Sequence, residues 1–473
     1  MIWFVAFACR ALQFGNPVIQ IDEQFYLLAG DRLLHGALPF VDIWDRKPFG
    51  LFALYAAIRA LGGSGILQYQ IVATLFAAAT ATAIAQIALR LSGPRGATIA
   101  GLVYLLFILS SGGDGGQAPV FYNLPVALAA LAVLKLQECT TIDRRAVGWG
   151  CLAMALVGVA VQIKYTVLFE GLFFGLCLLV LAWRRGARLV PVALLALLWC
   201  AIALLPTALV LGFYWQRGVL DQLVFANFLS VFQRSPHGLN LPARILRIAL
   251  HIALPAVVAG WAMRVRSPNR PAQWLVCAWL LAALAGVAVF GTYHAHYALP
   301  LFVPLAAAGA PLYGNRAAGL RLGRRHLSLG ALVLLVGGVL GLATMIGTRH
   351  SRGTGAAVYA AAQRVGTAPL GCIFVFSGDP ILYHLTNSCL PTAFLFPTFL
   401  SETQDSVSLG IDPIAELQRI LRARPAYIFT HERPPVEALP QAWAIMRGTL
   451  RRDYHLVFRH RAGTSVVLGY QRN

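Results

Sequence analysis

Long apolar stretches recur from the start of the chain to residue 347, and most are close to the length of a bilayer crossing. A membrane-spanning helix needs about 20 consecutive, predominantly apolar residues. The stretches lack the strict alternation of apolar and polar residues that membrane-spanning strands show, which favours helices. The pattern predicts ten or eleven helical spans, at residues 1–14, 66–89, 97–111, 119–136, 146–163, 165–183, 189–214, 243–263, 272–290, 296–313 and 327–347.

The first stretch is too short to cross a membrane alone, and Arg10 interrupts its apolar run. A cleaved signal peptide would carry a basic region before its apolar core, and this stretch does not. We expect a first helix that begins upstream of Met1 or is clipped at its start.

The segment between the first two spans, residues 15–65, is long enough to have a function of its own. It opens with apolar and charged residues mixed as in a helix at a membrane surface: Phe25, Leu28, Leu33 and Leu34 among Asp31, Arg32 and His35. Gly36 and Pro39 then end this helix. A second apolar helix, PFGLFALYAAIRAL, is expected to pack against the bundle or to dip into the membrane interface.

After residue 348 the composition becomes that of a soluble domain. GCIFVFSG and AYIFTHE are predicted strands, DPIAELQRILRA and PQAWAIMRGTLRRDY are predicted helices, and YHLVFRHRAGTSVVLGYQR is a predicted hairpin that turns at Ala462 and Gly463. Alternating strands and helices indicate a small α/β domain. We therefore predict an α-helical polytopic membrane domain, 1–348, which includes loop 15–65, and a soluble α/β domain, 349–473.

Composition supports a membrane protein, because only 12% of residues are charged against about 25% in soluble proteins. The net charge of +20 could indicate nucleic-acid binding, but fifteen basic residues lie in five alternate short loops. The intervening short loops, 112–118 and 291–295, carry none. Cytoplasmic loops are enriched in Lys and Arg, so the charge reports topology and argues against a nucleic-acid partner. Residues 15–65 and 349–473 are then expected on the periplasmic side of a bacterial cytoplasmic (inner) membrane.

Six of the eight cysteines lie in or beside the spans and are expected to be buried packing residues. Cys372 and Cys389 lie in the predicted outward domain, where an oxidising compartment would let them pair. The sequence alone does not decide whether these two cysteines form a disulfide. It contains no C-x-x-C motif and no Cys/His cluster, so no zinc site is expected.

Charged residues are scarce, yet several fall in the predicted outward loops: Asp22, Glu23, Asp45, Arg46, Lys47 and Asp114. One interpretation is that Asp22 only caps a helix that begins at Glu23. The other is catalytic, because a carboxylate can take the proton of an attacking hydroxyl while Lys and Arg stabilise charge on a departing phosphate. Transfer of a sugar from a lipid phosphate requires both, with Asp22 as the base and Arg46 and Lys47 on the phosphate.

The stretch DEQFYLLAGDRLLHGALPFVDIWDRKPFGLFALYA resembles the first outward loop of the membrane-embedded C-type (GT-C) glycosyltransferases. This family includes protein O-mannosyltransferases, aminoarabinose transferases and bacterial transferases that modify lipid A and lipopolysaccharide. Its members share an Asp-Glu pair after the first helix and a Lys-Pro-Pro sequence 20 to 30 residues later. Here Lys47 follows Asp22 by 25 residues, Pro48 comes next, and Phe49 replaces the second proline.

The segments VQIKYTVLFEG and HAHYALPLFVPLAAAGAP are also similar to the family. The resemblance implies that Asp22 is the catalytic acid, that Lys47 faces the donor phosphate, and that Asp114 is a second catalytic acid. Glu23, Asp45 and Arg46 are also predicted to contact the substrate, because they fall on the same outward side as Asp22 and Lys47.

The remaining candidates lie in or beside the later spans, and each keeps two interpretations. Lys164 is either an anchor at the membrane surface or a second phosphate ligand. His294, His296 and Tyr297 either end a span or contact donor or acceptor. Glu170 is expected to pair with a neighbouring helix, whereas Arg234 and His237 could gate the site or bind an anionic acceptor.

The predicted function is transfer of a hexosyl or pentosyl group from a polyprenyl-phosphate donor to a lipid, glycan or protein acceptor, with membrane lipids as surroundings. The alternative is a transporter or flippase of a lipid-linked substrate, for which internal repeats and charged residues at mid-membrane would be expected. No cofactor is expected. A divalent cation on the donor phosphate stays open, because paired acids allow it while the basic pair makes it dispensable.

Overall fold

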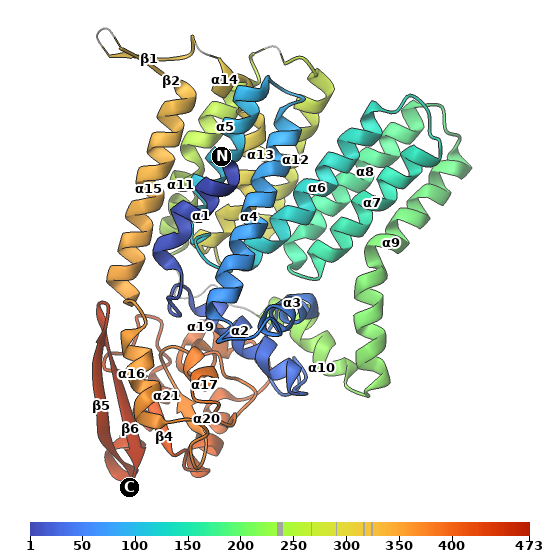
Figure 1. The fold of residues 1–473 in the computed structure, drawn as a ribbon. Helices are drawn as coiled ribbons and strands as arrows, with labels where there is room; N and C mark the ends of the chain where they lie inside the picture. Colours follow the sequence, from blue (N-terminus) through green and yellow to red (C-terminus); the bar gives the residue numbers. More distant parts are fainter. Residues whose placement is uncertain (234–239, 266, 290, 316, 323–324) are drawn as a thin grey trace. The chain divides into compact units, whose positions relative to one another are not determined.

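The computed structural model describes residues 1–233, 240–265, 267–289, 291–315, 317–322 and 325–473. Within them, eight helical segments are long and apolar enough to cross a membrane (Figure 1). They are Ile66–Ala88 (α4), Ala118–Glu138 (α6), Arg144–Val161 (α7), Tyr165–Arg184 (a 3-10 turn and α8), Leu189–Gln216 (α9), Leu241–Ala262 (α11), Arg270–Val289 (α12) and Leu329–Val365 (α15 and α16). The predicted α-helical polytopic membrane protein is confirmed.

Three predicted spans correspond to shorter apolar helices. Residues 1–14 form α1 (Ile2–Arg10) and a 3-10 turn (Ala11–Gln13), and residues 97–111 fall in α5 (Pro94–Leu109). The span predicted at 296–313 is divided into a 3-10 helix (Ala295–Leu301), α13 (Phe302–Ala308) and α14 (Ala310–Gly314). Prolines at 300, 304 and 311 explain the division, since each lacks the N–H that a continuous helix requires.

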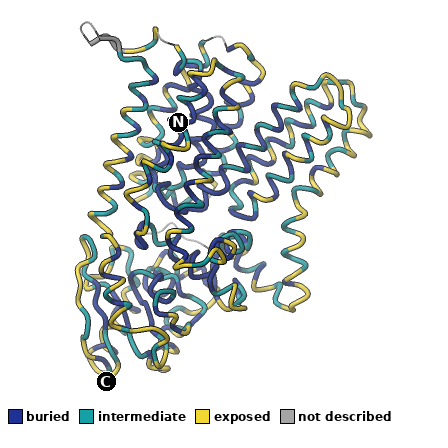
Figure 2. The backbone as a smooth tube through the Cα atoms, viewed as in Figure 1, coloured by how far each residue is buried: buried dark blue, intermediate teal, exposed yellow. Residues whose placement is uncertain are grey.

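Helix α9 differs from the other long helices in how little protein covers it. Only 6% of its most apolar window is buried, against 78% for α6. Figure 2 shows α9 mainly exposed or intermediate along its length. An apolar helix with so little protein around it is suited to contact with lipid chains, because its backbone hydrogen bonds are satisfied internally.

The chain divides into two compact units. The bundle unit contains Met1–Leu12, Ile71–Val210 and Asn240–Met345, and the sheet unit contains Gln13–Gln70, Leu211–Leu239 and Ile346–Asn473. The predicted domains divide the chain by composition at residue 348, whereas the contacts group residues 15–65 with the C-terminal segment.

Two helices of the sheet unit, α2 (Ile21–Leu34) and α3 (Phe49–Arg59), are the helices expected between the first two spans. They pack on each other so closely that a Cβ atom on Gly30 would lie 2.6 Å from the backbone nitrogen of Ala56. Glycine at this position therefore permits the contact. Phe25 and Leu28 are fully buried, so the apolar side of α2 is covered by protein.

The C-terminal part of the sheet unit contains the predicted α/β elements. Its sheet has the order β3-β4-β6-β5, from Ile373–Val375, Tyr427–His431, Ser465–Arg472 and Tyr454–Ala462. Strands β3 and β4 are parallel, and β5 and β6 form the expected antiparallel hairpin. Helix α20 (Pro413–Arg422), capped by Asp412 on the Ile414 N–H at 2.8 Å, precedes β4, and α21 (Pro440–Asp453) precedes β5. A short hairpin that the sequence did not predict, β1 (Gly319–Leu322) and β2 (Arg325–Ser328), belongs to the bundle unit.

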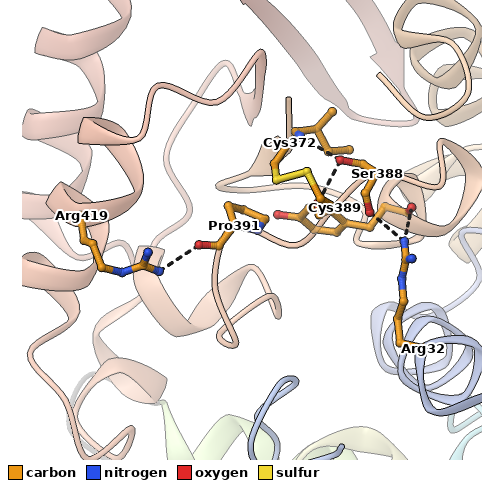
Figure 3. The surroundings of a disulfide bond; sticks show 8 residues. Arg32, Cys372, Ser388, Cys389, Pro391 and Arg419 are labelled. Atoms are coloured by element: carbon orange, nitrogen blue, oxygen red, sulfur yellow. Dashed lines mark hydrogen bonds between the residues drawn. A yellow bond between two sulfur atoms is a disulfide. The ribbon is translucent and has the colours of Figure 1, made fainter. Parts of the chain in front are cut away.

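Cys372 and Cys389 form a disulfide, as the sequence allowed. Figure 3 shows its surroundings. The Ser388 hydroxyl accepts a hydrogen bond from the Ile373 N–H at 2.9 Å, and Arg32 of α2 donates to the Ser388 carbonyl at 2.8 Å. The crosslinked segment is therefore bonded both to β3 and to α2.

Candidate active site

Helix α2 places two acids in its first turn. The helix begins at Ile21, and Gln20 is the N-cap residue with extended backbone angles (φ −136°, ψ 144°). The interpretation that Asp22 caps a helix beginning at Glu23 is therefore wrong, because Asp22 already lies inside the helix. Near the positive end of the helix dipole a carboxylate is favoured without serving as the cap.

Lys47 lies beside two carboxylates. Its Nζ is 3.1 Å from Asp45 Oδ1 and 3.7 Å from Asp22 Oδ1. Burial alone would lower the pKa of Lys47, but the charges of Asp45 and Asp22 outweigh it and raise the pKa. The side chains of Lys47 and Asp22 remain 29% and 20% exposed, so the Lys47 ammonium and the Asp22 carboxylate are both accessible to a bound molecule.

Aromatic rings surround the Lys47 ammonium. Nζ lies 5.4 Å from the ring centroid of Tyr26 and 5.9 Å from that of Phe396. The Tyr26 hydroxyl donates to Asp22 Oδ1 at 3.4 Å. Burial, followed by the charges of Asp22 and Asp45, raises the pKa of Tyr26 well above its usual range, so the phenol keeps its proton and acts as a donor to Asp22. Neither Tyr26 nor Phe396 was singled out from the sequence, where single aromatic residues give no signal.

Arg46 lies in a different environment from Lys47. Its guanidinium is 3.0 Å from Asp405 Oδ1 and also donates to the hydroxyl of Ser408. The Arg46 side chain is 12% exposed. These contacts direct the guanidinium toward Asp405 and Ser408, and the phosphate-binding role of Arg46 stays a prediction.

Glu23, another predicted substrate-binding residue, is fully buried. Burial, followed by the charge of Glu23, raises the pKa of Tyr55 in α3 well above its usual range. The role of Glu23 in substrate binding stays a prediction.

Asp114 belongs to the bundle unit, in the loop between α5 and α6, and is 4% exposed. Arg10 of α1 holds this loop, donating to the carbonyl of Gly115 at 3.3 Å and to that of Gly113. Arg10 is fully buried. It holds the loop that carries Asp114, a contact that the sequence interpretation missed although it noted that Arg10 interrupts an apolar run.

The other predicted residues of the bundle unit form a second group. Lys164 Nζ lies 4.6 Å from the ring centroid of Tyr297. The rings of His294 and His296 stack with their centroids 5.5 Å apart, and His296 lies 4.9 Å from Tyr297. Lys164 and Tyr297 line a cavity together with Tyr122, Thr166, Glu170 and Pro300. Lys164 therefore borders a small cavity, and both interpretations of this residue stay predictions.

Glu170 is paired with a neighbouring helix, as expected. The Trp279 indole N–H of α12 donates to Glu170 Oε1 of α8 at 2.6 Å, and both side chains are buried. Arg234 and His237 lie outside the described residues. Among the described residues, no group of three or more His, Cys, Asp or Glu side chains is placed to hold a metal ion.

The described residues form a polytopic helical bundle and a small C-terminal α/β region, and solved structures of other proteins share this fold. The chain is similar to ArnT from Cupriavidus metallidurans bound to undecaprenyl phosphate, with a TM-score of 0.66 and 16% identity over 99% of this chain and 96% of that one. The apo state of the same protein gives a TM-score of 0.61 and 16% identity, over 99% and 95%.

A more distant likeness is to the archaeal oligosaccharyltransferase AglB from Archaeoglobus fulgidus, in complex with an inhibitory peptide and a dolichol-phosphate. Here the TM-score is 0.51 and the identity 11%, over 100% of this chain and 73% of that one. No protein-family model and no curated protein sequence matches the chain. The likenesses therefore establish the fold.

Proposed function

We propose that this protein is a glycosyltransferase that moves a sugar from a polyprenyl-phosphate donor to a lipid, glycan or protein acceptor. The observation that carries the proposal is the 3.7 Å approach of the Lys47 ammonium to the Asp22 carboxylate, in a part-exposed setting. The structural neighbours support the donor class, because one holds undecaprenyl phosphate and another a dolichol-phosphate.

In the proposed reaction the acceptor hydroxyl attacks the anomeric carbon of the donor sugar. The new bond from the acceptor oxygen to this carbon forms as the bond to the phosphate oxygen breaks, and the acceptor proton passes to Asp22. The polyprenyl phosphate leaves with an additional negative charge. The Lys47 ammonium stabilises this charge, and its raised pKa keeps it protonated at neutral pH.

The ion pair of Asp22 with Lys47 connects these two roles. A donor phosphate at Lys47 would compete with Asp22 and Asp45 for the ammonium, because all three offer anionic oxygens to the same group. Asp22 would then lose a contact that stabilises its charged form and become a stronger base. Asp114, Lys164, His294, His296 and Tyr297 are proposed to serve the same reaction, and each requires its own test.

Substitution Asp22→Asn tests the base, since it keeps the shape of the side chain and removes its basicity. We expect transfer from a labelled polyprenyl-phosphate sugar to fall by about 100-fold or more. Asp453→Asn is the matched control, because Asp453 forms an exposed ion pair with Arg452 in the same unit. Turnover of the Asp22 variant close to that of the parent would remove Asp22 from the mechanism.

The proposed location is a bacterial cytoplasmic membrane, with the sheet unit on the periplasmic side. The basic short loops support this orientation, and so does the Cys372–Cys389 disulfide, which an oxidising compartment favours. A reporter that is active only in the periplasm should work when fused after residue 360. Activity from a fusion at residue 268 instead would reverse the orientation.

A further inference from the structure

A buried ion pair joins the loop of Lys47 to a distant part of the sheet unit. Arg46 and Asp405 are separated by 359 residues, and their side chains are only 12% and 15% exposed. Arg46 donates to Asp405 Oδ1 at 3.0 Å and to the Asp405 carbonyl at 3.2 Å, and also to the Ser408 hydroxyl. A guanidinium held by several acceptors has little freedom to turn.

Asp405 is itself fixed by a second partner. Its Oδ2 accepts a hydrogen bond from the Thr398 hydroxyl at 2.6 Å, so each carboxylate oxygen has a different donor. The Arg46 guanidinium also lies 4.9 Å from the ring centroid of Trp44 and 5.5 Å from that of Phe399. These stacking contacts suit the planar guanidinium and would be weaker for a lysine.

The backbone before Arg46 is held by the same segment. The Trp44 N–H donates to the Ala393 carbonyl at 2.9 Å, and the Trp44 ring packs against Phe394 and Phe399. Trp44 and Arg46 therefore bind segment 393–408. The residues that alternate with them behave differently: Asp45 pairs with Lys47, and Lys47 also lies near Asp22. Phe396, from the same segment, lies close to the Lys47 ammonium.

We propose that Asp405 is a positioning residue for Lys47: by fixing Arg46, it sets where the ammonium lies and thereby how tightly a lipid phosphate binds. This rests on the proposed function, in which Lys47 binds the donor phosphate. Segment 393–408 of the C-terminal region then determines donor affinity without touching the reacting atoms.

The test measures binding of undecaprenyl phosphate to the full chain in lipid nanodiscs. We expect Asp405→Asn to weaken binding by roughly 10- to 100-fold, because a displaced ammonium loses part of its charge-assisted contact with the phosphate. Lys47→Ala should weaken it too, and Asp405→Glu should restore part of the loss. Glu432→Gln is the control, since Glu432 forms an exposed ion pair with Arg459 in the same unit and should leave binding unchanged.

A purely structural role of Asp405 would not change the chemistry of one lysine. The chain has only three lysines, so acetylation by a small anhydride, measured by mass spectrometry, reports Lys47 against Lys135 and Lys164. We expect Asp405→Asn to change the labelling of Lys47 alone. If this variant does not fold, Ser408→Ala, which removes one acceptor of Arg46, carries the test and should give a smaller loss of binding in the same direction.

The outcomes separate the two proposals. Undiminished binding by Lys47→Ala would overturn the phosphate site, and the positioning role with it. The positioning role alone would be overturned if Lys47→Ala bound undecaprenyl phosphate weakly while Asp405→Asn kept both the binding and the Lys47 labelling of the parent protein.

Discussion

Replacement of Lys47 by alanine is the substitution whose cost the structure constrains most directly. An ammonium and a phosphate oxygen about 4 Å apart attract each other by about 4 kcal/mol at an effective dielectric constant of 20. The Lys47 side chain is 29% exposed, so solvent screens part of this energy. We take about 2–3 kcal/mol as the remaining loss, which corresponds to about 30- to 150-fold.

The loss should divide between donor binding and turnover. Part of the phosphate charge is present in the bound donor, which affects the donor KM, and part develops as the sugar leaves, which affects kcat. The assay is steady-state transfer with the donor and acceptor varied separately, and the acceptor KM should stay unchanged. Lys47→Arg should lose about 10-fold or less, because it keeps the charge but not the compact shape of the ammonium.

Lys135→Ala is the matched control, since Lys135 forms an exposed ion pair with Glu138. It should behave as the parent protein. The reasoning would be refuted by a folded Lys47→Ala variant whose donor use stays within about threefold of the parent, because a group in contact with the leaving phosphate cannot be removed at so small a cost.

Two further predictions concern stability. Cys372→Ser or Cys389→Ser removes a crosslink between residues 17 positions apart, which should lower the unfolding free energy by about 3 kcal/mol and the Tm accordingly. Reductant should lower the Tm of the parent protein in the same way. An unchanged Tm in both experiments would contradict the disulfide. Burial would raise the pKa of Asp31, but the hydrogen bonds and charges of His384 and Arg59 outweigh it and lower the pKa to about 2. This stabilisation is complete above about pH 4, the unfolded value, and is lost as pH falls toward 2. Asp31→Asn should therefore flatten the dependence of Tm on pH in this window, and an identical dependence in both proteins would count against it.

Much of the fold could be predicted from the sequence because its signals are local. Long apolar runs and the alternating strands and helices after residue 348 give the bundle and the α/β region directly. The divided span at 296–313 was not predicted, since its apolar character is continuous and only the prolines reveal the breaks. The start of α2 was misplaced because Gln20, a residue type that rarely caps helices, has the extended backbone of an N-cap.

The candidate site was predictable where its residues share one loop. Asp22 and Lys47 lie 25 residues apart in the segment before α4, so their proximity was a reasonable hypothesis. The partner of Arg46 could not be predicted in this way, because Asp405 lies 359 residues away and nothing in either local sequence marks the pair. Adjacent basic residues were therefore assigned one role, whereas the structure directs them to different partners.

The sheet unit is built from three separate segments of the chain, and this affects how the protein is made. The 275 residues between Gln70 and Ile346 separate its first segment from its last, and a ribosome needs about 15 to 55 s to add them. During that time α2 and the Lys47 loop have been synthesised, while Phe396 and Asp405 do not yet exist. A chain that stops before Ile346 would contain Asp22 and Lys47 but lack the segment that binds Arg46 and contacts Lys47, so the sheet unit is complete only once the last quarter of the chain has been made and has folded.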